Sequence, residues 1–207
     1  KPFAELGGSG LHIHASVYDG AGGNVFAHRE PAEPPHMTAT LLAGIGGLAN
    51  TVNEAMAIFA PNPNSYRRLK PGAYAPAGPT WGYDHREVAL RVPVSSEQNR
   101  RIEHRIAGAD ANPYLVLAAV LAGIHHGMRS DADPGEPVTR EADLSQSAVS
   151  FPTRLDGALE LFRAGKIIPA YLGERYARAY AVQRQGESDL YHGEVPDLDY
   201  SWYLRAL

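Results

Sequence analysis

Apolar and polar residues alternate without a break from Leu11 to Val17, and this stretch constrains the fold more than any other in the chain. Successive side chains of a β-strand point to opposite faces, so strict alternation predicts a strand with one buried and one open face. The apolar residues belong to the buried face. The open face carries His12, His14 and Ser16, and two imidazoles and a hydroxyl in a row need an explanation beyond folding.

The elements that follow this strand predict an α+β fold. A turn at 19–24 leads to a second strand at Val25–His28, and apolar residues at helical spacing predict a long helix from Met37 to Phe59. Two more alternating stretches, 86–93 and 100–107, predict further strands. This order of strands and helices favours an antiparallel sheet packed with helices. Further helices are expected at 112–128, from a capping box at 153–156 onward, at 170–185 and at 200–207.

Two features in the middle of the chain bear on packing and on function. Gly44, Gly46 and Gly47 lower the helix propensity of the long helix, but they permit close packing against another backbone. Residues 60–85 hold so many prolines and glycines that regular structure is not expected there. Long irregular loops in compact domains usually carry function, so we expect this loop to belong to a site.

The composition excludes several classes of protein. Hydrophobic residues make up 44% and charged residues 20% of the 207, which is globular and enough for one domain. A net charge of -4 argues against nucleic acid or an anionic membrane as a partner. The longest apolar stretch, at 41–49, is too short to span a bilayer. The absence of cysteine rules out disulfides and thiolate metal sites, and it fits a cytoplasmic protein.

The later strands also carry polar residues that could lie beside the open face of the first strand. Arg101, Glu103 and Arg105 alternate onto one face, and Arg91 lies on the polar side of the neighbouring stretch. Imidazole and carboxylate suit a divalent cation, and arginines hold phosphate or carboxylate oxygens through paired hydrogen bonds. Two plainer interpretations stay open: a solvated histidine pair and a surface ladder of charges. His104 lies on the apolar face and is expected in the core.

A His-x-His pair also opens the metal site of amidohydrolase-type hydrolases, which is a competing interpretation. Those enzymes need further histidines, an aspartate and usually a bridging lysine at the strand ends of a β/α barrel. In this chain Lys166 falls in a connection between helices, and the alternating order of strands and helices is missing. The sequence therefore disfavours such a hydrolase.

Four separated motifs, taken together, resemble the catalytic domain of the glutamine synthetase family. They are GGSGLHIHAS, NPNSYRRLKPG, ALRVP and RRIEHRIAGADANPYL, in that order, and the resemblance covers essentially the whole chain. It implies the guanido-kinase-like fold of that catalytic domain. It also implies that residues 1–207 are the C-terminal portion of the domain, and that the family's N-terminal β-grasp domain and the first part of the catalytic domain are absent.

The activity implied by this resemblance is an ATP-dependent ligase reaction. ATP phosphorylates the γ-carboxylate of glutamate, and an amine then displaces phosphate from the γ-glutamyl phosphate. The implied cofactor is Mg²⁺ or Mn²⁺, with ATP as co-substrate; metal and arginine would stabilise charge on the phosphoryl group in transit. By resemblance, the metal ligands are His12 and Glu103, the ATP contacts are His14, Ser16, Arg91 and Arg101, the glutamate contacts are Gly8, Arg68 and Arg105, and Arg86 faces the transferred phosphate.

Tyr74 marks a departure from the ordinary family pattern. Ordinary glutamine synthetases carry a glutamate in a Pro-Gly-x-Glu-Ala-Pro loop, which helps to bind and deprotonate ammonium, whereas this chain has PGAYAP. A tyrosine is a poor base, because its usual pKa is about 10. With TWGYDHR at 80–86 and EHRIAGADANPYLVLAA at 103–119, this resembles the γ-glutamylpolyamine (γ-glutamylputrescine) synthetase branch. The ring of Tyr74 could then line a pocket for an alkyl amine, with Trp81 as a second candidate contact.

Two alternatives to a putrescine-like amine stay open: ammonia, as in ordinary glutamine synthetases, and an inactive structural or regulatory homologue. The family builds its site between neighbouring subunits, so a ring-shaped homo-oligomer is implied for the full-length protein. We expect the chain alone to be inactive, because it holds only His12 and Glu103 of the implied metal ligands. The implied role is in nitrogen and polyamine metabolism.

Overall fold

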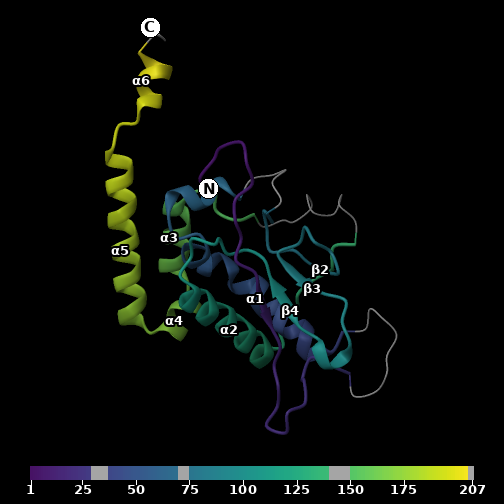
Figure 1. Ribbon diagram of the computed structural model, residues 1–207. Coiled ribbons are helices and arrows are strands. Elements are labelled where there is room, and N and C mark those ends of the chain that lie inside the picture. Colours follow the sequence, from purple (N-terminus) through teal and green to yellow (C-terminus); the bar gives the residue numbers. More distant parts are fainter. Residues whose placement is uncertain (29–36, 70–74, 140–149, 205–207) are drawn as a thin grey trace.

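The fold is α+β, as the order of the elements predicts (Figure 1). The computed structural model describes residues 1–28, 37–69, 75–139 and 150–204. Within them, four short strands form one sheet and the helices pack against it and beside it. The strands are β1 (Ile13–Ala15), β2 (Trp81–Tyr83), β3 (Leu90–Val92) and β4 (Ile102–His104). The helices are α1 (Ala39–Phe59), α2 (Pro113–Ser130), α3 (Leu155–Ala164), α4 (Ile168–Leu172), α5 (Glu174–Gly193) and α6 (Asp197–Tyr203), with 3-10 turns η1 (Pro63–Arg67) and η2 (Glu97–Asn99).

The sheet is mixed rather than antiparallel throughout. Its strand order is β1-β4-β3-β2, and β4 pairs antiparallel with both β1 and β3, as predicted. In contrast, β2 runs parallel to β3. Parallel neighbours usually need a long crossover. Here each strand spans only about 10 Å, so the connection 84–89 is long enough to bring the chain back.

The predicted strand at Val25–His28 is wrong. The turn after β1 closes with one bridge, Tyr18 to Asn24, and the chain then bends away. The side chain of Asn24 accepts a hydrogen bond from the backbone N–H of Phe26 at 3.0 Å, an Asx turn that replaces the pairing of an extended strand. The bend carries the Phe26 ring into the core, where it is fully buried.

The loop at 60–85 contains more regular structure than its composition predicts. Its described part holds η1 and β2. The turn η1 begins with a reciprocal capping box, in which Asn62 and Ser65 each bond the other's backbone N–H, and Pro63 suits its first position. Trp81 in β2 is buried, and its indole N–H donates to the carbonyl of Gly135 at 2.9 Å. Short regular elements therefore form in this loop despite its prolines and glycines, with Pro63 at the start of η1 and Gly82 inside β2.

Helices α1 and α2 cross with almost no side chain between them, as the glycines of α1 predict. A Cβ at Gly47 would lie 2.2 Å from the carbonyl oxygen of Gly123 and 2.4 Å from the Cα of Gly127. A Cβ at Gly127 would lie 2.0 Å from the carbonyl oxygen of Ala43. The two backbones are therefore in direct contact. The N-terminus of α1 is capped by Thr38 and that of α2 by Asn112.

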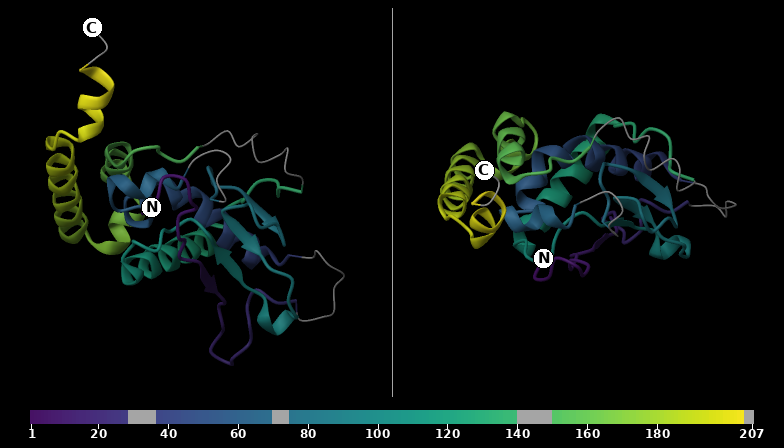
Figure 2. Two further views of the ribbon diagram at one scale, coloured as in Figure 1. Left: turned by 45° about the horizontal axis from the view of Figure 1, so that its top comes forward. Right: turned by 90° about the horizontal axis from the view of Figure 1, so that it is seen from above.

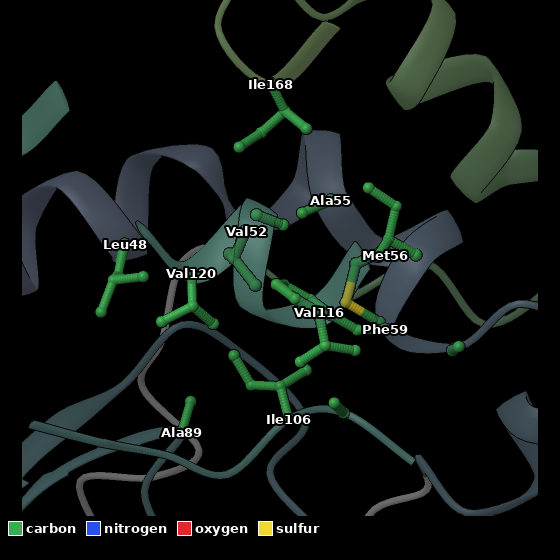
Figure 3. Close-up of a cluster of buried hydrophobic side chains, with 14 of the residues drawn as sticks. Leu48, Val52, Ala55, Met56, Phe59, Ala89, Ile106, Val116, Val120 and Ile168 are labelled. Atoms are coloured by element: carbon green, nitrogen blue, oxygen red, sulfur yellow. The ribbon is translucent and has the colours of Figure 1, made fainter. Parts of the chain in front are cut away.

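The main core lies where α1 and α2 meet the segments around the sheet. Figure 3 shows side chains of α1 and α2 gathered against Ala89 and Ile106, which flank β3 and β4. His104 of β4 belongs to this core, as predicted: it is 1% exposed and its ring lies 4.5 Å from that of Phe59. Burial lowers the pKa of His104 to about 3, so the imidazole is neutral.

The C-terminal helices differ from expectation at their boundaries. The predicted capping box at 153–156 is absent, because α3 begins after Arg154 without a side-chain cap and Asp156 instead accepts a hydrogen bond from Ser188. The predicted helix at 170–185 is divided into α4 and α5 by Gly173, whose φ is +85°. The helix expected at 200–207 begins earlier, as α6, and residues 205–207 lie outside the described part.

Helix α5 runs along one side of the molecule, and α6 extends beyond it, away from the sheet (Figures 1 and 2). Both helices carry large exposed apolar side chains. Within the described residues, no helix has the length and apolar character needed to cross a membrane.

Candidate functional site

One face of the sheet gathers most of the polar residues singled out from the sequence. Because β1 and β4 are antiparallel, His14 lies opposite Glu103. The register of β3 places Arg91 opposite Glu103 on the other side. Three neighbouring strands therefore deliver imidazole, carboxylate and guanidinium groups to one surface, with His12 at the entry to β1.

Glu103 is the centre of this cluster. Its side chain is only 4% exposed, and Oε2 accepts a hydrogen bond from Arg91 Nη1 at 2.8 Å. Its other oxygen, Oε1, accepts from Arg105 Nη1 and lies 3.1 Å from His12 Nδ1. Burial alone would raise the pKa of Glu103, but the bonds from Arg91 and the charge of Arg105 outweigh it and hold the pKa below its usual range. The carboxylate is thus ionised and fixed.

His12 is kept neutral beside this carboxylate. Burial lowers its pKa, as does the charge of Arg105, and these effects outweigh the opposing influence of Glu103. Its side chain remains 40% exposed. A neutral imidazole with one open side is the form that binds a metal ion.

The donor set of this cluster fits part of a site for a divalent cation. His12 Nδ1 and Glu103 Oε1 are 3.1 Å apart, close to the ~3.0 Å expected between adjacent ligands of an octahedral ion with bonds of about 2.1 Å. The described ranges of the chain contain no group of three or more histidine, cysteine, aspartate or glutamate side chains that could hold a metal. Among the described residues, His12 and Glu103 are the pair that could contribute two ligands to such a site.

The outer part of the same face carries the residues expected to contact a nucleotide. Arg101 Nε donates to His14 Nδ1 at 3.1 Å, which joins β1 and β4 through side chains. The hydroxyl of Ser16 donates to the backbone carbonyl of Arg100 at 3.0 Å, so it also fastens β1 to the start of β4. His14 is exposed and Ser16 half-buried.

Arg68 and Gly8 meet at the opposite end of β4. Arg68 follows η1 and is buried, and its guanidinium donates to the carbonyl of Ile106. A Cβ at Gly8 would lie 2.9 Å from Arg68 Cγ and 3.0 Å from Cδ, so the glycine makes room for the arginine stem. Burial lowers the pKa of Arg68 and the charge of Asp110 opposes this. Arg68 and Arg105 thus lie at one end of the polar cluster.

Three other residues named from the sequence have different outcomes. Arg86 lies in the connection between β2 and β3 and is exposed. Tyr74 falls outside the described residues. Trp81 is buried and its indole N–H is bonded to Gly135, which fits the interpretation that it packs the loop; its contact with an amine stays a prediction.

Sequence reasoning missed two aspartates that hold arginine-bearing segments. Asp84 pairs with Arg91 Nη2, and Asp110 accepts a hydrogen bond from the Ser65 hydroxyl at 2.6 Å. Both lie in turns, where no periodicity assigns a side chain to a face. The available signal was residue type, since aspartate is enriched in turns and tolerates left-handed backbone.

Comparison with known proteins gives a family match over nearly the whole chain. Residues 1–203 match the family model described as glutamine synthetase, catalytic domain. The chain is 38% identical over 205 residues to gamma-glutamylputrescine synthetase PuuA of Escherichia coli (strain K12), covering 99% of this chain and 42% of that protein. It is 33% identical over 207 residues to glutamate–isopropylamine ligase of a Pseudomonas species, covering 99% and 44%.

The fold has a counterpart among solved structures. The structure titled apo GmaS without ligand superposes with a TM-score of 0.85 and 29% sequence identity, covering 100% of this chain and 47% of that one. The chain thus spans less than half the length of the relatives that it matches.

Proposed function

The chain belongs to the glutamine synthetase family, and from this premise we propose that it forms the C-terminal portion of the catalytic domain of an ATP-dependent ligase. The ligase joins the γ-carboxylate of glutamate to an amine through a γ-glutamyl phosphate. The relatives reported above are named as ligases or synthetases, which supports this class of reaction. The remainder of the active site comes from segments that the matched relatives contain and this chain does not cover.

The observation that carries the proposal is the arrangement around Glu103. One buried, ionised carboxylate lies beside a neutral imidazole, His12, and between two arginines, Arg91 and Arg105. His12 and Glu103 would hold a divalent cation, Mg²⁺ or Mn²⁺, which neutralises phosphate charge when bound. The arginines would grip phosphate or carboxylate oxygens through paired hydrogen bonds.

Each remaining residue takes, in this proposal, the role that the family resemblance implies, and its position is compatible with that role. Arg68 and Arg105, at one end of the cluster, bind the carboxylates of glutamate, with Gly8 leaving room for Arg68. At the other end, His14, Ser16 and Arg101 face ATP together with Arg91. The exposed Arg86 reaches the phosphoryl group in transit and stabilises its charge.

A primary amine with an alkyl chain is the amine that we propose. The names of the two relatives specify putrescine and isopropylamine, which are both alkyl amines. At position 74 the chain has tyrosine, a neutral side chain that offers a ring for alkyl contact and no carboxylate for ammonium. Ammonia is the alternative co-substrate, favoured by the family description itself.

Phosphate release from the full-length protein tests the proposal. The protein is mixed with glutamate, ATP and Mg²⁺, and then with putrescine, isopropylamine, ethanolamine or ammonia in parallel. We expect glutamate-dependent release that an alkyl amine stimulates more than ammonia. Burial of two or three methylenes is worth about 0.8 kcal/mol each, or one to two decades in kcat/KM. Equal kcat/KM for ammonia and the alkyl amines overturns the choice of amine, and the absence of glutamate-dependent release overturns the ligase.

The variant Tyr74→Glu sharpens this experiment. Restoring a carboxylate at position 74 is expected to raise kcat/KM for ammonia and to lower it for putrescine. The matched control is Tyr114→Glu, since Tyr114 is an exposed tyrosine at the start of α2. A change of the same size in both variants would assign the effect to charge alone.

We also propose that the full-length protein assembles into a ring of identical subunits. The ring is what the family resemblance implies, and large exposed apolar side chains on α5 and α6, which include Leu190, Trp202 and Tyr203, support a contact between subunits. Light scattering coupled to gel filtration measures the assembly, and a monomer at micromolar concentration contradicts it.

A further inference from the structure

Asp84 has a backbone conformation that side chains rarely adopt. Its φ is +50°, in the left-handed region, and among the described residues only one other non-glycine residue, Asp131, has a positive φ. Asp131 caps the C-terminus of α2, where this conformation is common. Asp84 instead ends β2, and its N–H donates to the carbonyl of Val92 at 2.9 Å. Strain of this kind persists where the surrounding structure enforces it.

This conformation turns the Asp84 carboxylate toward Arg91. Arg91 Nη2 donates to Asp84, while Nη1 of the same guanidinium donates to Glu103 Oε2 at 2.8 Å. One planar group therefore bridges two carboxylates that come from the end of β2 and from β4. The side chain of Arg91 is only 15% exposed, so its orientation is set by these two partners.

The two carboxylates bridged by Arg91 stand in different relations to the proposed chemistry. Glu103 is the proposed metal ligand through Oε1, the oxygen that Arg105 also contacts, whereas Arg91 is bonded to Oε2. The side chain of Asp84 is 46% exposed, and its carboxylate is bonded to Arg91 Nη2. The hydrogen bond from Arg91 lowers the pKa of Asp84, and the charge of Arg86 contributes to the same direction, so Asp84 is ionised and close to both arginines.

We propose that Asp84 is a positioning residue for Arg91: with Glu103 on the other nitrogen, it holds the guanidinium in the orientation in which it faces the nucleotide phosphates. This inference rests on the proposed function, because it assumes that Arg91 contacts ATP. It adds to that function a residue that touches neither substrate nor metal. Asp84 acts through the direction of its hydrogen bond to Arg91.

The test uses the full-length protein and measures ADP affinity by calorimetry in the presence of Mg²⁺, without turnover. Asp84→Asn keeps the left-handed backbone and the side-chain shape but removes the charge, and Asp84→Gly keeps the backbone and removes the side chain. We expect the Kd for ADP to rise by about fivefold to tenfold in both, the loss of one charge-assisted hydrogen bond. Asp131→Asn is the matched control, and we expect its Kd to be unchanged.

A double-mutant cycle separates positioning from a general structural effect. If Asp84 acts through Arg91, Arg91→Lys lowers ADP affinity, and adding Asp84→Asn lowers it little further. Additive losses, or an unchanged Kd with only a lower melting temperature, overturn the inference. The KM for glutamate is expected to stay within twofold, because Arg91 lies on the nucleotide side. If the unaltered protein binds no ADP, the proposed function fails first, and the inference fails with it.

Discussion

Glycine is needed at position 8, because the stem of Arg68 occupies the space where a Cβ would be. In Gly8→Ala the arginine must shift, and its guanidinium with it. We expect the KM for glutamate to rise about tenfold, the size of one lost charge-assisted contact, with kcat changed less. Steady-state kinetics of the full-length protein at varied glutamate measure this. The matched control is Gly7→Ala, since a Cβ at Gly7 meets nothing within 4 Å, and equal effects of the two would contradict the role of Gly8.

Arg86 is the residue that we expect to affect turnover most selectively. It is exposed in the connection before β3, and its proposed partner is the phosphoryl group, whose charge shifts during transfer. Arg86→Ala should lower kcat about 100-fold and leave the KM for glutamate nearly unchanged. Arg175→Ala, an exposed arginine of α5, is the control. A raised KM with an intact kcat would show that Arg86 binds the ground state instead.

For single residues, the sequence predicts which face a side chain occupies when the residue lies on a strand, but not when it lies in a turn. Strand parity places His12 and His14 on one polar face and Glu103 on the polar face of a later strand. The register then sets His14 opposite Glu103, and His12 lies 3.1 Å from the same carboxylate. The position of the Asp84 side chain could not be predicted, because it depends on one unusual φ angle. Parity likewise cannot show that Arg91 bridges two carboxylates, since that depends on a parallel strand that the pattern does not reveal.

At the scale of elements, the contact between α1 and α2 gives the sharpest stability prediction. Gly47→Ala places a Cβ 2.2 Å from a backbone oxygen, which no side-chain rotation can relieve. We expect the free energy of unfolding to fall by about 3 kcal/mol or more. Gly186→Ala is the opposite case, because it lies in α5 with nothing within 4 Å of its Cβ, and it should gain about 0.5–1 kcal/mol. Urea denaturation measures both; a neutral Gly47→Ala would show that the helices can separate at little cost.

Helices and strands with a long periodic pattern of apolar residues could be predicted more reliably than short ones. The long helix α1 follows from apolar spacing, and α2 also from the cap at Asn112; the structure adds the cap of α1 at Thr38. Short elements depend on single contacts instead. The Asx turn at Asn24 ends a predicted strand, and the positive φ of Gly173 divides a predicted helix. Neither event leaves a periodic signal in the sequence.

At the scale of the whole molecule, the incomplete metal cluster predicts the behaviour of the chain alone. The described residues bring together His12 and Glu103 but no third ligand of their kind. Charge on a phosphoryl group would therefore go largely unneutralised, and we expect residues 1–207 alone to show no glutamate-dependent ATP hydrolysis above a no-enzyme blank. The full-length protein is the positive control, and its Glu103→Gln variant is the negative one. Turnover by the chain alone would falsify the division of the site between segments.

The backbone contact between α1 and α2 has a consequence for how such a chain can change in evolution. Where two large side chains meet, a substitution that enlarges one can be rescued by a second that shrinks its partner. Gly47 faces Gly123 and Gly127, which have nothing left to shrink. No second-site suppressor on the facing helix is available for an enlarged residue there. A substitution at any one of these glycines is therefore not tolerated, and the crossing of the two helices stays the same. Elsewhere in the core, a larger side chain at one position can be compensated by a smaller one at its neighbour.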